Sequence, residues 1–322
     1  MHQLSLLVLA ATATASEFHG IVKEVNSANL GWRAEVPSRF NSSEEGKALC
    51  GTFLKGHPKY RDYQLPAMAV ITDIDVPASF DSRDAFPKCP LIGHVRDQSA
   101  CASCWAFAGT EAYESRLCVS TGKSVDLSEE DVLACNGGDA GDCTGGQPAS
   151  AMIWIQIDGA VTGGDYNETG TCKPYTLPPC AHHSTSPKYK PCPSHLYPTP
   201  ACKKTCVSDY SKSYTADKIK GGHVAYVLGI AQIKAALVKG GPLATAFHLY
   251  ADFLTYKSGV YQHQTGEYLG GHAVLIIGYG TEAGTDYWLV KNSWNDSWGA
   301  DGFFKIAHGE CDIDDGPITV TF

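Results

Sequence analysis

The chain has 322 residues, of which 43% are hydrophobic and 18% are charged, a composition typical of a globular protein. Its formal net charge of −9 argues against nucleic acid as a partner, because surfaces that bind nucleic acid are basic. The length is enough for one large hydrophobic core or two smaller ones.

Residues 1–15, MHQLSLLVLAATATA, predict a secretory signal peptide, because an apolar stretch leads to small residues at Ala13 and Ala15. No later stretch approaches the roughly 20 apolar residues that span a bilayer, so we predict no membrane span. The expected location is the secretory pathway, with a lysosome, an acidic vacuole or the outside of the cell as its end. There the 13 cysteines should form disulfides, and their odd number leaves at least one thiol free.

Residues 16–75 are polar and hold too few apolar side chains for a core of their own. The composition changes at DIDVPASF, where an extended segment leads into denser hydrophobic sequence. We therefore place a boundary near Val76, between an N-terminal extension and a main domain over residues 76–322.

The main domain begins with predicted helices and continues with predicted strands. Helical patterns of apolar residues cover about 104–117, 126–135, 147–159 and 230–241. Ser128 is a candidate N-cap, with Asp131 three residues later. Short β-like runs separated by Gly and Asp follow at 242–250, 270–280, 285–294 and 302–307. This order predicts an α+β fold of two lobes with a site in the cleft between them.

Residues 172–206 separate the helices from the strands and are rich in proline, cysteine and histidine, with no regular period. A loop of this length inside a compact domain is usually functional, and disulfides could hold it in shape.

The segment 97–107, DQSACASCWAF, has two cysteines two residues apart, and three functions fit it. A redox pair would follow a strand in a βαβ unit, which the preceding residues do not supply. A zinc site would need a second pair of ligands, for which CKKTC or HH are candidates, although secreted chains usually oxidise their cysteines. The third function is a nucleophilic thiol at Cys104, where the start of a buried helix would stabilise a thiolate.

A nucleophilic thiol needs an imidazole and a group that orients the imidazole. His272 is the only polar side chain at the head of a buried apolar strand, where a lone histidine is more often a structural core residue. Asn292 could accept a hydrogen bond from the imidazole under the shield of Trp294, although Asn before Ser is also common in turns. Taken together, these residues favour the nucleophile.

The chain resembles the papain family of cysteine peptidases, and within it the cathepsin B group. The matching stretches are DQSACASCWAF, CAHH, YKSGVYQH, GGHAVLIIGYG and YWLVKNSWNDSWGADGFFKI, with LCGTFLKG in the extension. His272 lies 168 residues after Cys104, against roughly 130–150 in papain and its relatives. The surplus matches residues 172–206 in size, which correspond to the occluding loop of the cathepsin B group. The resemblance implies a helical left lobe, an antiparallel and barrel-like right lobe, and an inhibitory propeptide at 16–75.

The resemblance also implies a role for each site residue. Cys104 would be the nucleophile, His272 its acid–base partner and Asn292 the group that orients the imidazole. Gln98 would donate to the oxyanion, together with the backbone N–H of Cys104. Peptide bonds would then be hydrolysed through a thiolate–imidazolium pair, already formed at pH 5, and an acyl-enzyme, with no metal or other cofactor.

His182 and His183 match the histidine pair with which the occluding loop binds the C-terminal carboxylate of a substrate. This implies dipeptidyl carboxypeptidase activity as well as internal cleavage. His182 is also expected to pair with Asp97 and so latch the loop down. Further substrate contacts are implied for Trp294 and Gly146.

Five disulfides are implied by the same resemblance: Cys89–Cys118, Cys101–Cys143, Cys135–Cys202, Cys172–Cys206 and Cys180–Cys192. They would leave Cys50, Cys104 and Cys311 free. Asn41 and Asn167 occupy glycosylation sequons and are expected to carry glycans, whereas Asn295, in a third sequon, is expected to be bare.

The chain departs from the family pattern at Ser99, Ala102, Tyr279 and Gly316, and two of these positions bear on substrate binding. Ala102 stands where the family has glycine, and we expect its methyl group to crowd the substrate groove and to reduce or alter activity. Gly316 stands at about the place of the acidic residue in the second specificity pocket, which removes the group that would accept arginine, although Asp314 and Asp315 lie nearby in the sequence.

Two other classes of function stay open: a papain-like binding protein without activity, and a metal-binding or redox protein built on the paired cysteines and histidines. Under the peptidase hypothesis the expected partners are protein and peptide substrates, the chain's own propeptide and cystatin-type inhibitors. We expect a monomer.

Overall fold

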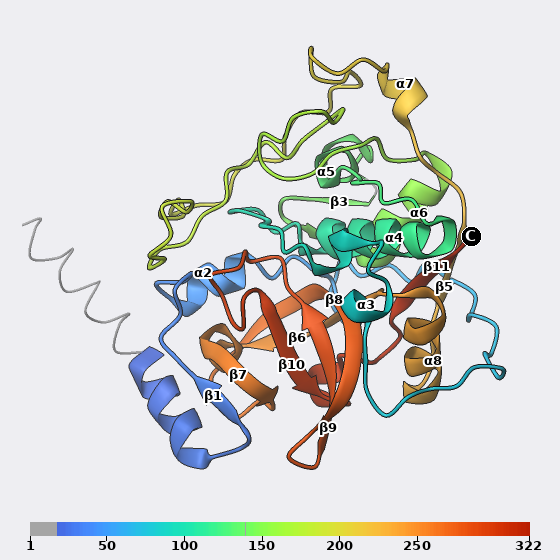
Figure 1. Cartoon of the computed structure of the whole chain (residues 1–322). Helices are drawn as coiled ribbons and strands as arrows, with labels where there is room; N and C mark the ends of the chain where they lie inside the picture. The colour runs from blue at the N-terminus through green and yellow to red at the C-terminus, as the bar shows by residue number, and fades with distance from the viewer. Residues whose placement is uncertain (1–17, 139) are drawn as a thin grey trace, which may run out of the picture.

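The structure, a computed structural model, describes residues 18–138 and 140–322, and the predicted signal peptide lies outside these residues. Helices α4, α5 and α6 gather in one half of the molecule and the large sheet lies in the other (Figure 1). This arrangement confirms the predicted α+β class with two lobes. No helix within the described residues is long and apolar enough to cross a membrane.

A helix over residues 18–28 opens the described chain. The following helices are α2 (Ser43–Ala48), α3 (Ser82–Ala85), α4 (Cys104–Thr121), α5 (Glu129–Cys135), α6 (Pro148–Ile157), α7 (Tyr214–Asp217) and α8 (Ile230–Gly240). The strands are β1 (Trp32–Ala34), β2 (Phe80–Asp81), β3 (Gly141–Asp142), β4 (Gly145–Gly146), β5 (His223–Tyr226), β6 (Leu243–Tyr250), β7 (Tyr256–Tyr261), β8 (Tyr268–Glu282), β9 (Thr285–Lys291), β10 (Phe303–Ala307) and β11 (Ile318–Thr321).

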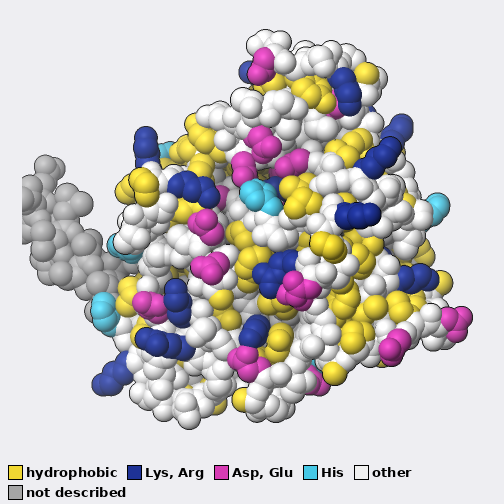
Figure 2. Space-filling view, viewed as in Figure 1, with side chains coloured by type: hydrophobic (Ala, Val, Ile, Leu, Met, Phe, Trp, Pro, Cys, Tyr) yellow, Lys and Arg dark blue, Asp and Glu magenta, His cyan; other side chains and the backbone are white. Residues whose placement is uncertain are grey.

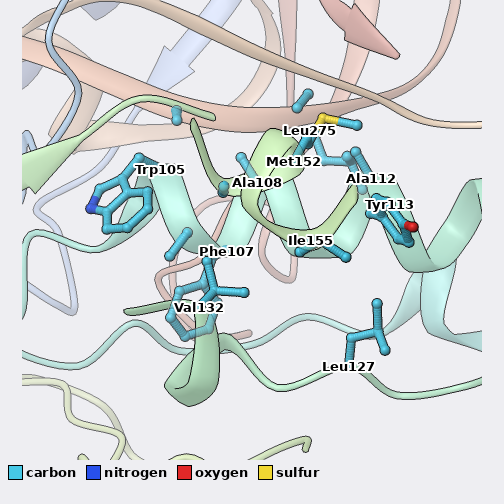
Figure 3. Packing of buried hydrophobic residues seen from close by; sticks show 14 of the residues in the cluster. Trp105, Phe107, Ala108, Ala112, Tyr113, Leu127, Val132, Met152, Ile155 and Leu275 are labelled. Carbon is cyan, nitrogen blue, oxygen red and sulfur yellow. The ribbon is translucent and has the colours of Figure 1, made fainter. Parts of the chain in front are cut away.

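Helix α4 is buried on almost every side and fixes the position of Cys104, its first residue. It ends at Gly122, whose φ of 72° is costly for a residue with a Cβ atom. Its side chains pack in one hydrophobic core with those of α5, α6 and β8, and Figure 3 labels Trp105, Phe107, Tyr113, Val132, Met152, Ile155 and Leu275 of this core. Helix α5 begins as predicted, because the hydroxyl of Ser128 accepts a hydrogen bond from the N–H of Asp131.

The large sheet has nine strands in the order β1-β7-β10-β9-β8-β6-β11-β5, with β2 added beside β8. Its pairs are antiparallel except β7 with β10, which run parallel. The path ends at β1 and β5 without closing, so the described strands form an open sheet and no closed barrel. A second hydrophobic core, rich in aromatic side chains such as Trp294 and Phe253, lies on this sheet.

The N-terminal segment 18–75 lies along the main domain and contributes to both edges of the sheet. Strand β1 pairs with β7 at one edge, and Ala67 pairs with Tyr226 of β5 at the other. Edge strands carry unpaired backbone groups, so this segment satisfies groups that would otherwise face solvent. On the face in Figure 2, acidic and basic side chains are interspersed over the surface.

Arg96 lies in a buried ionic cluster at the base of the helical lobe. Its guanidinium contacts Glu114 at 3.0 Å and Asp126 at 2.6 Å, and it also contacts Glu129. Three carboxyl groups therefore surround one cation. Burial raises the pKa of Glu114 to about 8, although the charge of Arg96 lowers it. The cluster thus favours a protonated carboxyl group in the folded protein.

We predict that this cluster makes the fold more stable in acid than at pH 8. The pKa of Glu114 is higher in the folded than in the unfolded chain. Its contribution to the free energy of unfolding is therefore complete below the pKa of the unfolded chain and is lost as pH rises towards 8. Relative to Glu114→Gln, the melting temperature of the protein should therefore decline more, or rise less, between pH 5 and pH 8, by a few degrees at about 2–4 °C per kcal/mol. An equal change in both proteins would contradict the prediction.

Candidate active site

Cys104 lies at the N-terminus of α4, between the two lobes, and is fully buried. Its Sγ lies 3.3 Å from Oγ1 of Thr52, which belongs to the N-terminal segment. The backbone N–H groups of Ala273, Gly51 and Trp105 also interact with the thiol. Donors from both lobes and from the N-terminal segment therefore converge on this sulfur atom.

His272 lies in β8, and Asn292 directly follows β9, the strand paired with β8. The imidazole Nε2 and the Asn292 Oδ1 are 2.8 Å apart. Since an amide oxygen only accepts, Nε2 carries a proton and donates it to this bond. Nδ1 is buried and has no hydrogen-bond partner, so it is available to exchange a proton with another group. Trp294 stacks on the ring with a centroid distance of 4.6 Å.

The surroundings of this pair favour its neutral form. Burial raises the pKa of the Cys104 thiol, although hydrogen bonds from Thr52 and the backbone oppose the rise. Burial lowers the pKa of His272 to about 4, against the effect of its bond to Asn292, and the charge of Arg39 lowers it further. The ion pair expected from the sequence is therefore disfavoured here, because the N-terminal segment excludes water from the cleft.

Gln98 is held by Ser293 on one side of its amide. The Ser293 hydroxyl donates to Oε1 at 2.8 Å, and the backbone N–H of Gln98 donates to the carbonyl of Ser293 at 2.9 Å. Nε2 donates to the carbonyl of Cys101 at 2.8 Å and lies 3.4 Å from that of Leu49. The Gln98 amide nitrogen therefore bonds the main domain at Cys101 and also lies near a carbonyl oxygen of the N-terminal segment, that of Leu49.

Residues 51–53 cross the cleft between the two lobes, where Thr52 forms isolated bridges to Gly146 and Gly271. Thr52 N–H donates to the carbonyl of Gly271, and Phe53 N–H donates to that of Gly146, each at 3.0 Å. Gly146 N–H returns a bond of 2.8 Å to Gly51. Gly146 thus lies in the cleft, where it binds extended backbone, and any other chain is kept from Cys104.

The methyl group of Ala102 fits in the groove because the residue of the N-terminal segment opposite it is Gly51. A Cβ atom on Gly51 would overlap the carbonyl oxygen of Ala102 and would lie 2.9 Å from its methyl group. The groove is therefore narrow at this point, and it has room for a residue without a side chain.

The predicted pair of Asp97 with His182 is absent from this structure, so that expectation is wrong for this form of the chain. Asp97 instead binds Arg39 at 3.0 Å, and His182 binds Glu45 at 3.1 Å. The physical reason is competition, because two charges of the N-terminal segment occupy both partners. The loop 172–206 itself reaches towards α2 (Figure 1). The backbone N–H of His183 donates to Ser38 of the same segment.

The structure joins Cys89–Cys118, Cys101–Cys143, Cys135–Cys202, Cys172–Cys206 and Cys180–Cys192, and it leaves Cys50, Cys104 and Cys311 free. These are the pairs that the resemblance implied. Among the described residues, no three His, Cys, Asp or Glu side chains are grouped so that they could hold a metal ion.

The three sequons differ in accessibility. Asn167 is exposed and Asn41 is partly exposed, whereas Asn295 is buried and its amide donates to Asp97 at 2.7 Å. The same nitrogen also donates to the carbonyl of Cys180, so a glycan on Asn295, which replaces one amide hydrogen, would remove one of these two bonds.

A cavity of about 470 Å³ lies next to residues 52–54, and Gly316, Asp312 and Asp315 line part of it. Asp314 has a different environment, because its carboxylate accepts a hydrogen bond from the indole of Trp288. Asp312 and Asp315 thus bring negative charge to a pocket where Gly316 brings none.

Arg39, Glu45, Thr52 and Ser293 contact the predicted site residues but were not singled out in the sequence. The first three lie in a polar extension with no pattern of its own, and their contacts span long distances along the chain. Ser293 could have been found, because it lies between Asn292 and Trp294 in a short motif.

Comparisons with known proteins agree with this site. Residues 76–321 match the model described as papain family cysteine protease. Cathepsin B-like cysteine proteinase 6 of Caenorhabditis elegans is 43% identical over 316 residues, which cover 94% of this chain and 83% of that protein. Cathepsin B-like cysteine proteinase 4 of the same organism is 42% identical over 302 residues, which cover 91% and 89%. The structure of procathepsin B S9 from Trypanosoma congolense is similar with a TM-score of 0.78 and 29% identity, covering 94% of this chain and 97% of that one.

We predict that Gly51→Val exposes the Cys104 thiol. The new side chain cannot fit against Ala102, so residues 51–53 should leave the cleft. Alkylation of Cys104 by iodoacetamide, followed by peptide mass spectrometry, should become at least several-fold faster. Gly20→Val is the matched control, because that position of the same segment has open space around it. Unchanged protection of Cys104 in Gly51→Val would refute the predicted role of the close contact.

Proposed function

Because this chain belongs to the papain family of cysteine proteases and is a cathepsin B-like cysteine peptidase, we propose that it is made as a precursor with a signal peptide (1–15) and an inhibitory propeptide (16–75). The peptidase domain would be residues 76–322. The five disulfides support a route through the oxidising secretory pathway, with a lysosome-like compartment or secretion as its end. The solved relative is also a precursor form.

The observation that carries the proposal is the segment 51–53 in the cleft, with Thr52 against the thiol of Cys104. This segment fills the place of a substrate, and the pair of Cys104 and His272 is held neutral beneath it. Removal of the propeptide lets water return, which stabilises charge on both groups. The proton of the thiol can then move to Nδ1 of His272, the nitrogen that has no partner here.

Catalysis then follows from the positions of four side chains. The Cys104 thiolate attacks the carbonyl carbon of the peptide bond, and Gln98 Nε2 with the backbone N–H of Cys104 stabilises the oxyanion. The His272 imidazolium gives its proton to the leaving amine, which leaves a thioester. His272 then takes a proton from water, the hydroxide attacks the thioester, and the acid product leaves as the thiolate–imidazolium pair is restored. Asn292 keeps the imidazole oriented throughout.

We expect Gln98→Ala in the processed protein to lower kcat/KM by roughly 10²–10³ with little change in KM, because one oxyanion donor is lost. Cleavage of a fluorogenic peptide at pH 5 measures this change. Cys104→Ala should abolish turnover, and Gln264→Ala, at an exposed glutamine, should leave it unchanged. Full activity in Gln98→Ala would remove this residue from the mechanism.

The occluding loop adds a second proposed activity, the release of dipeptides from C-termini. His182 contacts Glu45 of the propeptide, and the backbone N–H of His183 donates to the carbonyl of Ser38, so the propeptide occupies the surroundings of this histidine pair. Histidine side chains are cationic in acid and can bind a terminal carboxylate. When the propeptide leaves, Asp97 loses Arg39 and His182 loses Glu45. Unpaired buried charges are costly, so the two residues should then pair and bring the loop over the cleft.

A peptide with a free C-terminus should lose dipeptides stepwise at pH 5, whereas the same peptide with an amidated C-terminus should be cut only internally. His182→Ala and His183→Ala should each lower dipeptide release by roughly 10- to 100-fold, as expected when a charge-assisted hydrogen bond worth about 1.5–3 kcal/mol is lost, and should leave internal cleavage in place. Mass spectrometry of the products distinguishes the two activities. Equal dipeptide release from both peptides would exclude the carboxylate-binding role of the loop.

A further inference from the structure

The outer edge of β5 binds a second part of the propeptide, residues 66–71, which follow the cleft residues 51–53 in the chain. Strand β5 is the last strand of the sheet, with β11 on its other side. Tyr226 N–H donates to the carbonyl of Pro66 at 2.9 Å, and Met68 N–H donates to the carbonyl of Tyr226 at 2.7 Å. The propeptide thus extends the sheet by a short parallel strand at residue 67.

Three residues later the side chain of Gln232 continues this pattern. Its Oε1 accepts from the N–H of Ile71 at 2.8 Å, and its Nε2 donates to the carbonyl of the same residue at 3.3 Å. The amide of Gln232 thus bonds the N–H and the carbonyl group of one residue, as the backbone of a neighbouring strand would. Gln232 lies in the first turn of α8, and the light-blue chain that leads to α3 passes beside β5 and α8 in Figure 1.

The side chains of this segment divide into two kinds. Met68 and Ile71 are partly buried and pack against the core of the sheet lobe, which Val238 of α8 also contacts. Val70 between them is 71% exposed, and Ala69 is exposed as well. Tyr226 and Gln232 therefore bind the backbone of the segment, and the core accepts apolar side chains at two positions that are three residues apart. The side chains between these positions face solvent, so the surface does not select for them.

A hollow next to this segment has room for more than the propeptide supplies. Its volume is about 420 Å³, and Met68, Ile71, Val119 and Phe322 line it together with Arg116. Ser120 and Lys239 line it as well, so the hollow offers polar as well as apolar contacts.

We propose that the edge of β5 and Gln232 form a docking surface for extended polypeptide, separate from the catalytic cleft. Residues 66–71 occupy it in the precursor. Once the propeptide has left, the surface is free to bind an extended segment of another polypeptide that has apolar residues three apart. The proposal rests on the proposed removal of residues 16–75, since the surface is covered until then. Residues 54–65 join the two contacts, so the propeptide is a bivalent ligand of its own peptidase.

The test compares two peptides that both contain the cleft residues 51–53, one covering 43–72 and the other 43–63. Both are titrated against the Cys104→Ser protein after removal of its propeptide, with fluorescence anisotropy as the readout, because an alkyl group on Cys104 would occupy the place of Thr52. Processing is by an added protease, since this variant does not turn over. Binding needs no turnover, so a failure of the proposed peptidase activity would not affect the result.

The longer peptide should bind at least tenfold more tightly, and Gln232→Ala should remove most of this advantage without weakening the shorter peptide. Ala231→Ser, at an exposed neighbour, should preserve it, and thermal melts check that each variant is folded. A long peptide whose residues 64–72 keep only Met68 and Ile71 should retain the advantage, whereas Met68→Asp with Ile71→Asp should lose it. Equal affinity of the two peptides, or equal weakening of both by Gln232→Ala, would overturn the proposal.

Discussion

The exclusion of water from the cleft decides whether Cys104 and His272 are charged, and the state of the whole site depends on it. Three residues of the N-terminal segment bridge the two lobes through backbone hydrogen bonds and place Thr52 on the thiol. A thiolate and an imidazolium both lose solvation when they are buried, so the cleft holds them neutral. The propeptide thus acts on the chemistry of Cys104 and His272 as well as on access to them. Gly51 makes this possible, since a side chain there would meet Ala102.

Charges of the propeptide act on the occluding loop in a comparable way. Arg39 is almost completely buried against Asp97, and Glu45 is paired with His182. These contacts keep both partners of the expected latch occupied while the loop rests on α2. Loss of the propeptide removes one cation and one anion from this region together, which leaves Asp97 and His182 as complementary charges. Inhibition and the arrangement of the loop are therefore coupled through the same four side chains.

Local features of this fold could be predicted from the sequence, whereas contacts that depend on distant parts of the chain could not. Helix α4 followed from its wide apolar face, and the start of α5 followed from Ser128. The pairing of His272 with Asn292 was expected because both lie in short motifs. The contact of Asp97 with Arg39 was not predicted, because Arg39 lies in a polar extension whose path over the main domain has no signature in the sequence. The parallel pair of β7 and β10, and the addition of residue 67 to β5, likewise depend on the folded arrangement.

The most direct test of the account is the pH dependence of Cys104 alkylation, measured site by site in the precursor and in the processed protein. We expect the processed protein to react rapidly already at pH 5, because its thiolate–imidazolium pair is formed. In the precursor the rate should rise only above the ordinary pKa of a thiol, about 8.5, because the covered pair stays neutral. The pH at the midpoint of the profile distinguishes a raised pKa of the Cys104 thiol from steric protection of the thiol. Steric protection alone lowers the rate of alkylation and leaves the midpoint unchanged. An acid-shifted midpoint in the precursor would contradict the central claim.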